Sequence, residues 1–325
     1  MWFKLKKKLF SLLIIASILL CGCKNSSVDF LTYQDTAAIA GTALDTELTK
    51  GDFFARKLAI VTQGNNTGGD SQLTSGAELL INDTDNQVIY ADKVYDRLYP
   101  ASLTKLLTAL VVLRNGELTD TVTVGYNAAH ITESGAKLCG FHEGDTITLE
   151  ALLYSMLIYS GNDAAVAAAE HVGKSVEEFA GLMNEEAARL GAVHSNFVNP
   201  NGLHDDNQYT TAYDLYLIFH ELLQYDTFRK IISTASYTVD YADQDGNAKE
   251  KIFNSTNLYL KEDGTEEPGL TVIGGKTGTT SKAGNCLILL SKDKEDKEYI
   301  SVILKAENSN KLYSQMSYLL SMVSK

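Results

Sequence analysis

The stretch Tyr99-Pro-Ala-Ser-Leu-Thr-Lys105 marks the start of a helix and holds the first candidate catalytic pair. Apolar residues recur at helical spacing from Leu103 to Val111, and Pro100 stands just ahead of them. On a helix, Ser102 and Lys105 lie on one face, one turn apart, so a hydroxyl and an amine come within hydrogen-bonding reach. A serine attacks only when a base removes its proton, and a lysine is that base only where its pKa is lowered. Alone, such a pair is more often a solvated helix face.

Two further motifs follow in order. Ser160-Gly161-Asn162 interrupts two apolar helical segments, 149–158 and 164–172, and by itself it reads as a helix–helix turn with Ser160 or Asn162 as an N-cap. Lys276-Thr277-Gly278-Thr279-Thr280 ends a strand that begins near Leu270. A cation and hydroxyls on such a strand are able to hold a carboxylate, and a glycine lets another backbone approach closely.

The hydrophobic pattern predicts an α+β fold. The predicted strands are 57–61, 77–82, 87–91, 237–241, 270–276, 285–291 and 299–304. Additional helices are predicted at 176–190, 211–223 and 310–323. Strands at both ends with helices between them indicate an antiparallel sheet flanked by helices, plus an all-helical subdomain.

The N-terminus indicates export. Four lysines precede the apolar run 9–20, which is too short for a permanent span of about 20 residues and is typical of a signal peptide. Leu20-Cys21-Gly22-Cys23 resembles a bacterial lipoprotein box, so we expect lipidation at Cys23 and attachment to the membrane through acyl chains. The expected organisation is a signal peptide at 1–22, a flexible tether at 23–56 and a catalytic domain at 57–325. A secreted soluble protein or an uncleaved signal anchor is the alternative.

Composition excludes some partners. The formal net charge is −13, which argues against nucleic acid as a partner of the folded part. After processing, Cys139 and Cys286 remain, and their distance in sequence does not establish a disulfide. The histidines show no zinc-ligand spacing, so no metal or organic cofactor is predicted.

In combination the three motifs match the known signature of penicillin-binding proteins and class A β-lactamases. The chain resembles the D-alanyl-D-alanine carboxypeptidases of the serine peptidase S11 family. The resemblance rests on the 99–105 stretch and on Ser160-Gly-Asn-Asp-Ala-Ala165, Asn199-Pro-Asn-Gly-Leu203 and Ala212-Tyr-Asp-Leu215. It implies the penicillin-binding-protein/β-lactamase-like transpeptidase fold.

The resemblance also implies roles. Ser102 would attack the bond between the two terminal D-alanines of a peptidoglycan stem peptide, and Lys105 would take its proton. Ser160, with Lys276, would pass a proton to the departing D-alanine, while Asn162 would hold the peptide or orient Lys105. The substrate carboxylate would lie against residues of the third motif, namely Lys276, Thr277, Gly278 and Thr279 or Thr280. The oxyanion would meet the N–H groups of Ser102 and Thr279. β-Lactams would acylate the same serine.

One other reading stays open, the first of the following three, and the other two are disfavoured. A D,D-endopeptidase that cuts cross-links would use the same machinery. A class A β-lactamase would need a glutamate between the second and third motifs, where 198–204 reads Val-Asn-Pro-Asn-Gly-Leu-His. A penicillin sensor would join this domain to membrane helices, which the sequence does not predict.

Overall fold

The computed structural model describes residues 58–66, 68–261 and 269–324. All of them belong to the second of two units into which the chain divides, Phe54–Lys325. The predicted signal peptide, the tether and the lipidated Cys23 therefore lie outside the described residues. Within the described ranges, no helix has the length and apolarity that a membrane crossing needs.

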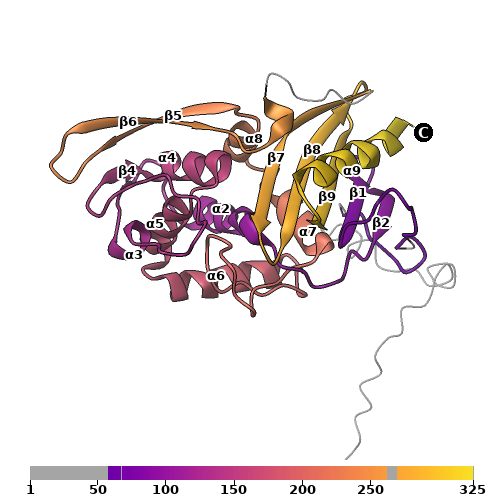
Figure 1. Cartoon of the computed structure of the whole chain (residues 1–325), viewed down its shortest axis with the longest axis horizontal. Coiled ribbons are helices and arrows are strands. Elements are labelled where there is room, and N and C mark those ends of the chain that lie inside the picture. Colours follow the sequence, from indigo (N-terminus) through magenta and orange to yellow (C-terminus); the bar gives the residue numbers. More distant parts are fainter. Residues whose placement is uncertain (1–57, 67, 262–268, 325) are drawn as a thin grey trace, which may run out of the picture. The chain divides into compact units, whose positions relative to one another are not determined.

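A five-stranded antiparallel sheet forms the centre of this unit, in the order β2-β1-β9-β8-β7 (Figure 1). Its strands are β1 (Ala77–Asn82), β2 (Gln87–Asp92), β7 (Leu270–Thr280), β8 (Gly284–Asp293) and β9 (Glu298–Ala306). The strands predicted in these regions are confirmed. Because β7 pairs only with β8 within this sheet, the strand that carries the third motif is an edge strand.

Both faces of the sheet are buried. Along β8, Leu287 and Leu289 join a cluster with helix α9 (Ser309–Ser321), whereas Ile288 and Leu290 join the main core with α7 (Ala212–Leu222) and α8 (Asp226–Ile232). Side chains alternate between the two faces of a strand, so an unbroken apolar run suits a strand that is covered on both sides. The helix predicted at the C-terminal end is thus confirmed as the cover of one face (Figure 1).

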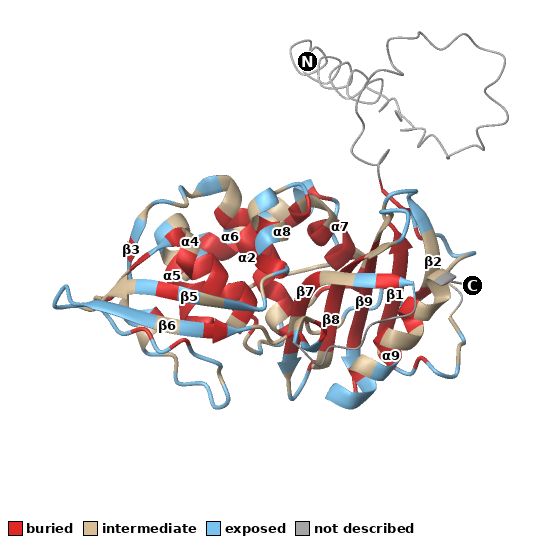
Figure 2. Ribbon diagram, turned by 90° about the horizontal axis from the view of Figure 1, so that it is seen from above, coloured by how far each residue is buried: buried red, intermediate tan, exposed pale blue. Residues whose placement is uncertain are grey.

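The rest of the unit is mostly helical. It contains α2 (Thr104–Asn115), α3 (Tyr126–Ala129), α4 (Leu149–Tyr154), α5 (Asn162–Gly173) and α6 (Val176–Arg189). A four-stranded sheet accompanies these helices, in the order β3-β4-β5-β6, and of its strands the sequence predicted only the one at 237–241. Its strands are β3 (Thr121–Thr123), β4 (Thr146–Thr148), β5 (Ser236–Ala242) and β6 (Ala248–Asn254). Most of β6 is exposed (Figure 2). An exposed strand has only a weak apolar pattern, so the sequence did not predict it.

The first predicted strand is wrong. Residues 58–61 are assigned to no strand, although three of the four are buried. Tyrosine hydroxyls take the place of a neighbouring strand here. The N–H of Ala59 donates to Tyr216 Oη at 3.1 Å, and Tyr213 Oη donates to the Ala59 carbonyl at 3.0 Å. A buried backbone needs hydrogen-bond partners, and side chains supply them as well as a sheet does.

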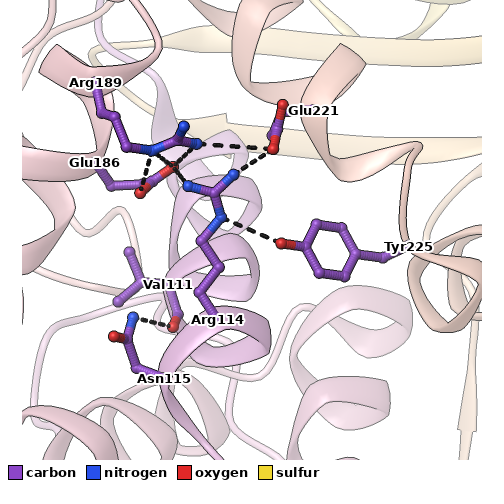
Figure 3. Close-up of polar contacts among 7 residues, drawn as sticks. All are labelled: Val111, Arg114, Asn115, Glu186, Arg189, Glu221 and Tyr225. Carbon is purple, nitrogen blue, oxygen red and sulfur yellow. Dashed lines mark hydrogen bonds and ion pairs between the residues drawn. The ribbon is translucent and has the colours of Figure 1, made fainter.

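Helix α2 is fastened at its C-terminal end by an ion-pair network (Figure 3). The Arg114 guanidinium lies 2.6 Å from a carboxylate oxygen of Glu186 on α6 and also pairs with Glu221 on α7. Its Nε donates to Tyr225 Oη at 3.1 Å, and Arg189 approaches both glutamates from outside. Planar, forked donors suit such multiple contacts. The network therefore fixes the helix that carries the first motif against two neighbouring helices.

Candidate active site

Ser102 lies in a tight turn that leads into α2. The turn is a 3-10 helix, Ala101–Leu103, and Ala101 has a positive φ of 48°. Such a conformation is uncommon for alanine and marks a constrained position. One helical turn later, Lys105 is fully buried, and its Nζ lies 3.1 Å from Ser102 Oγ. The structure thus brings together the two residues that the spacing paired.

Lys105 has two further contacts. Its Nζ donates to Asn162 Oδ1 at 2.7 Å and also to the backbone carbonyl of Asn201. Burial lowers the pKa of Lys105 to about 7, although the partial charges of Cys139 and Asp163 act in the opposite direction. Burial penalises the charged form of an amine, so a large share of this lysine is neutral near pH 7. Its amine is therefore suited to accept a proton.

The second motif occupies a strained corner. A π-helical turn, Ser155–Tyr159, ends at Ser160, whose φ of 71° is left-handed, and α5 begins at Asn162. Gly161 has no room for a side chain, because an added Cβ would lie 2.2 Å from Cys139 Sγ. The left-handed backbone conformation of Ser160 costs a non-glycine residue about 1–2 kcal/mol of free energy, and it persists only where the surrounding structure holds it in place. This turn orients the Ser160 hydroxyl toward a second lysine.

That second lysine is Lys276 on β7. Its Nζ donates to Ser160 Oγ at 2.9 Å and to the Thr277 carbonyl at 2.8 Å. Burial holds the pKa of Lys276 well below its ordinary value, and the charges of Lys105 and Lys137 lower it further. The amine therefore faces the serine of the second motif rather than open solvent.

Glycine at position 278 lets β7 approach the Ser102 turn. An added Cβ there would lie 3.1 Å from the backbone nitrogens of Ser102 and Leu103 and from the Pro100 carbonyl oxygen. Real Cβ atoms rarely come so close, so a larger residue would push the strand and the turn apart. The backbone of the third motif is thus set against the backbone of the first.

A cavity of about 390 Å³ opens over these groups, within the range of small-ligand sites. Of the predicted site residues, Ser102, Ser160, Thr277, Gly278 and Thr279 line it. The remaining lining residues are Gly135, Lys137, Thr256, Leu258, Asn285, Ser309, Leu312 and Tyr313.

Four predicted site residues do not line this cavity. Lys105, Asn162 and Lys276 lie beneath it, where they contact its serines or one another. Thr280 lies outside it, and its Oγ1 accepts the Ala283 N–H at 3.0 Å in the turn after β7. Among the described residues, no cluster of three potential metal ligands occurs.

The family model for D-alanyl-D-alanine carboxypeptidases, peptidase S11, matches residues 63–308 of this chain. The chain belongs to the peptidase S11 family. It is 30% identical over 272 residues to the D-alanyl-D-alanine carboxypeptidase DacF of Bacillus subtilis, covering 82% of this chain and 66% of that protein. It is 31% identical over 252 residues to DacC of Escherichia coli, covering 75% of this chain and 60% of the relative.

Solved structures agree on the fold. The DD-transpeptidase of Streptomyces K15 aligns with a TM-score of 0.71 and 26% identity, over 78% of this S11 chain and 98% of that one. The expected α+β, penicillin-binding-protein-like fold is therefore confirmed. The chain spans less than two thirds of the length of several curated relatives that it matches.

Some site residues were missed by sequence reasoning. Asn201 acts through its backbone carbonyl, which no residue pattern reveals, although it lies inside the recognised 199–203 stretch. Asp163, directly after the second motif, accepts the N–H groups of Cys139 and Gly140 at 2.9 and 2.8 Å and so holds one wall of the site. Cys139 and Cys286 are both free and buried, which answers the disulfide question for this structure.

Proposed function

We propose that this chain is a serine D-Ala-D-Ala carboxypeptidase that removes the terminal D-alanine from peptidoglycan stem peptides. The observation that carries the proposal is the buried Lys105 amine, in contact with Ser102, Asn162 and the Asn201 carbonyl. A solvated helix face, the ordinary reading of Ser-x-x-Lys, would leave the lysine exposed. Here all three motifs converge on one cavity.

Lys105 is arranged to act as the general base. A neutral amine has two N–H donors and one lone pair. The oxygens of Asn162 and Asn201 take the two donors, which leaves the lone pair for the Ser102 hydroxyl. As the Ser102 Oγ–carbon bond forms at the scissile carbonyl, the hydroxyl proton passes to Lys105.

Ser160 and Lys276 are arranged to protonate the leaving group. When the carbon–nitrogen bond breaks, the departing D-alanine nitrogen needs a proton. Ser160 Oγ lines the cavity and receives a hydrogen bond from Lys276, so the hydroxyl is free to give its own proton to the amine. Over the whole step one proton leaves the Ser102 hydroxyl and one reaches the departing amine, so the protons balance.

β7 supplies the groups that bind the rest of the substrate. We propose that the hydroxyls of Thr277 and Thr279 hold the terminal carboxylate, with the Lys276 amine beneath them as a further hydrogen-bond donor. Thr280 would have no direct contact. The N–H groups of Ser102 and Thr279 would stabilise the oxyanion, a role supported by the close approach of β7 to the Ser102 turn at Gly278.

Water then attacks the acyl-enzyme, and Lys105 takes its proton. A class A β-lactamase would use a glutamate for this step, but the 198–204 segment presents the Asn201 carbonyl to Lys105 instead. β-Lactams would therefore acylate Ser102 and leave slowly. We further propose that the protein works outside the cytoplasm as a lipoprotein modified at Cys23, which is supported by the sequence of the leader.

Two measurements test this proposal. Labelled penicillin is expected to remain covalently bound to the wild type and to be absent from Ser102→Ala, whereas rapid penicillin turnover would indicate a β-lactamase. Incubation with purified muropeptides is expected to release free D-alanine. Cleavage of cross-linked dimers without free D-alanine would favour the endopeptidase, and the absence of both products would overturn the peptidase proposal.

A further inference from the structure

Lys137 lies in the wall of the catalytic cavity, together with Ser102 and Ser160. Its position is fixed by the second motif, because its carbonyl accepts the Asn162 N–H at 2.8 Å. The following residues are held in turn by Asp163, as described above. The side chain of Lys137 therefore stands at a defined place beside the nucleophile.

Within the described part of the chain, the ammonium of Lys137 has no anionic partner. Its Nζ lies 4.1 Å from the centroid of the Tyr159 ring, a cation–π contact. Among the described residues, no carboxylate forms an ion pair with it and no carbonyl accepts from it. Lys251, by contrast, is occupied by the carbonyls of Cys139 and Gly140. Lys137 is thus a cation of the cavity that is still free to bind a ligand.

Its electrostatic surroundings favour an anion. Burial lowers the pKa of Lys137; the Cys139 thiol acts in the opposite direction, and the positive charge of Lys261 lowers it further. A negative group placed at Lys137 would relieve this repulsion between two cations. The whole chain carries a net charge of −13, so an anionic peptide needs such a local cation to enter the cavity.

Resting on the proposed function, we propose that Lys137 binds a side-chain carboxylate of the stem peptide, and that it selects peptides whose third residue is a diamino diacid over those with lysine there. The terminal carboxylate is assigned to Thr277 and Thr279, so Lys137 meets a second negative group. The ammonium of a lysine side chain at the same place would be repelled. Lys137 is then a specificity residue and takes no part in proton transfer.

The test uses the full-length protein and three peptides that end in D-Ala-D-Ala. Their third residue is meso-diaminopimelate, the same residue with its side-chain carboxyl amidated, or L-lysine. We expect kcat/KM for D-alanine release to be about threefold to fivefold higher with the free carboxylate than with the amide, as an ion pair of an exposed lysine gives. Lys137→Met is expected to bring this ratio close to one, and Lys137→Arg to preserve it.

Two controls separate the explanations. Lys294→Met removes an exposed lysine after β8 and should leave the ratio unchanged, which excludes an effect of net charge. Penicillin carries only the counterpart of the terminal carboxylate, so its acylation rate should be the same in Lys137→Met and wild type. A slower acylation in that variant, or equal loss with all three peptides, would place Lys137 on the terminal carboxylate and overturn the inference.

An unchanged peptide ratio in Lys137→Met would overturn it as well. Failure of the proposed function is distinct from either result, because the wild type would then bind penicillin but release no D-alanine from any of the three peptides.

Discussion

The burial of Lys105 should cost stability in a way that depends on pH. Its folded pKa of about 7 lies 3.5 units below the reference value of 10.5, which corresponds to about 5 kcal/mol against the folded state while the lysine is charged. Because the unfolded chain binds the extra proton between pH 7 and pH 10.5, stability rises with pH in that window. Below pH 7 the full cost is present.

Lys105→Met removes this contribution. Between pH 7 and pH 9, the free energy of unfolding of the wild type should rise by up to about 1.4 kcal/mol per pH unit. Because part of the lysine is already neutral at pH 7, the total rise is about 2 kcal/mol. The variant lacks the gain, so its stability relative to wild type should fall by that amount over the same interval. Hydrogen bonds lost by the variant affect both pH values alike and cancel.

Urea unfolding followed by far-ultraviolet circular dichroism at pH 7 and pH 9 measures the effect. Ser102→Ala is the matched control, since it retains Lys105 and should follow the wild-type change with pH. If the difference between Lys105→Met and wild type is the same at both pH values, the folded lysine keeps its proton over this interval just as the unfolded one does, and its assignment as a base with a lowered pKa fails.

Three further outcomes follow from the same structure. Acylation of the protein by penicillin should accelerate about tenfold from pH 6 to pH 8 as Lys105 becomes neutral, and a flat stopped-flow profile would contradict this. Gly202→Ala should abolish penicillin labelling and cost about 3 kcal/mol or more in urea unfolding, because its Cβ would lie 1.9 Å from the carbonyl oxygen of the nucleophile turn. Gly191→Ala, equally left-handed but with open space around it, should cost only about 1 kcal/mol, and equal losses would refute the steric argument. Arg114→Met should lower stability by about 1 kcal/mol, because Glu186 and Glu221 lose their partner on α2 and keep only the more exposed Arg189, whereas Lys93→Met, at an exposed pair, should change the melting temperature little; equal shifts would show that the network does not stabilise α2.

The sequence predicted those parts of the site that depend on local spacing. Ser102 and Lys105 are one helical turn apart, so their contact follows from helix geometry alone. The contact between Ser160 and Lys276 joins residues 116 positions apart, and only the recognised motif set suggested it. The Asn201 carbonyl could not be predicted, because any residue supplies a carbonyl and only the tertiary fold determines where it points.

The fold shows the same division. Long apolar runs such as β8 were predicted because burial on both faces leaves a strong pattern. The exposed strand β6 has no such pattern, because it is held by pairing with β5 rather than by packing into a core. The mistaken strand at 57–61 fails for the opposite reason. Its apolar residues are buried, but tyrosine hydroxyls satisfy its backbone, and an apolar run alone does not distinguish the two arrangements.

The close packing at Gly278 has a consequence for motion. At Gly278 two backbones pack directly against each other, with no side chain between them that could change its conformation. β7 and the Ser102 turn must therefore move together. Any widening of the cavity to admit a peptide or release D-alanine then falls to the other walls, those of residues 135–137 and 256–258. Under the proposed function, the attacking oxygen and the oxyanion donors would keep their spacing throughout a turnover, while the peptide's side chains would meet the part of the cavity that is able to yield.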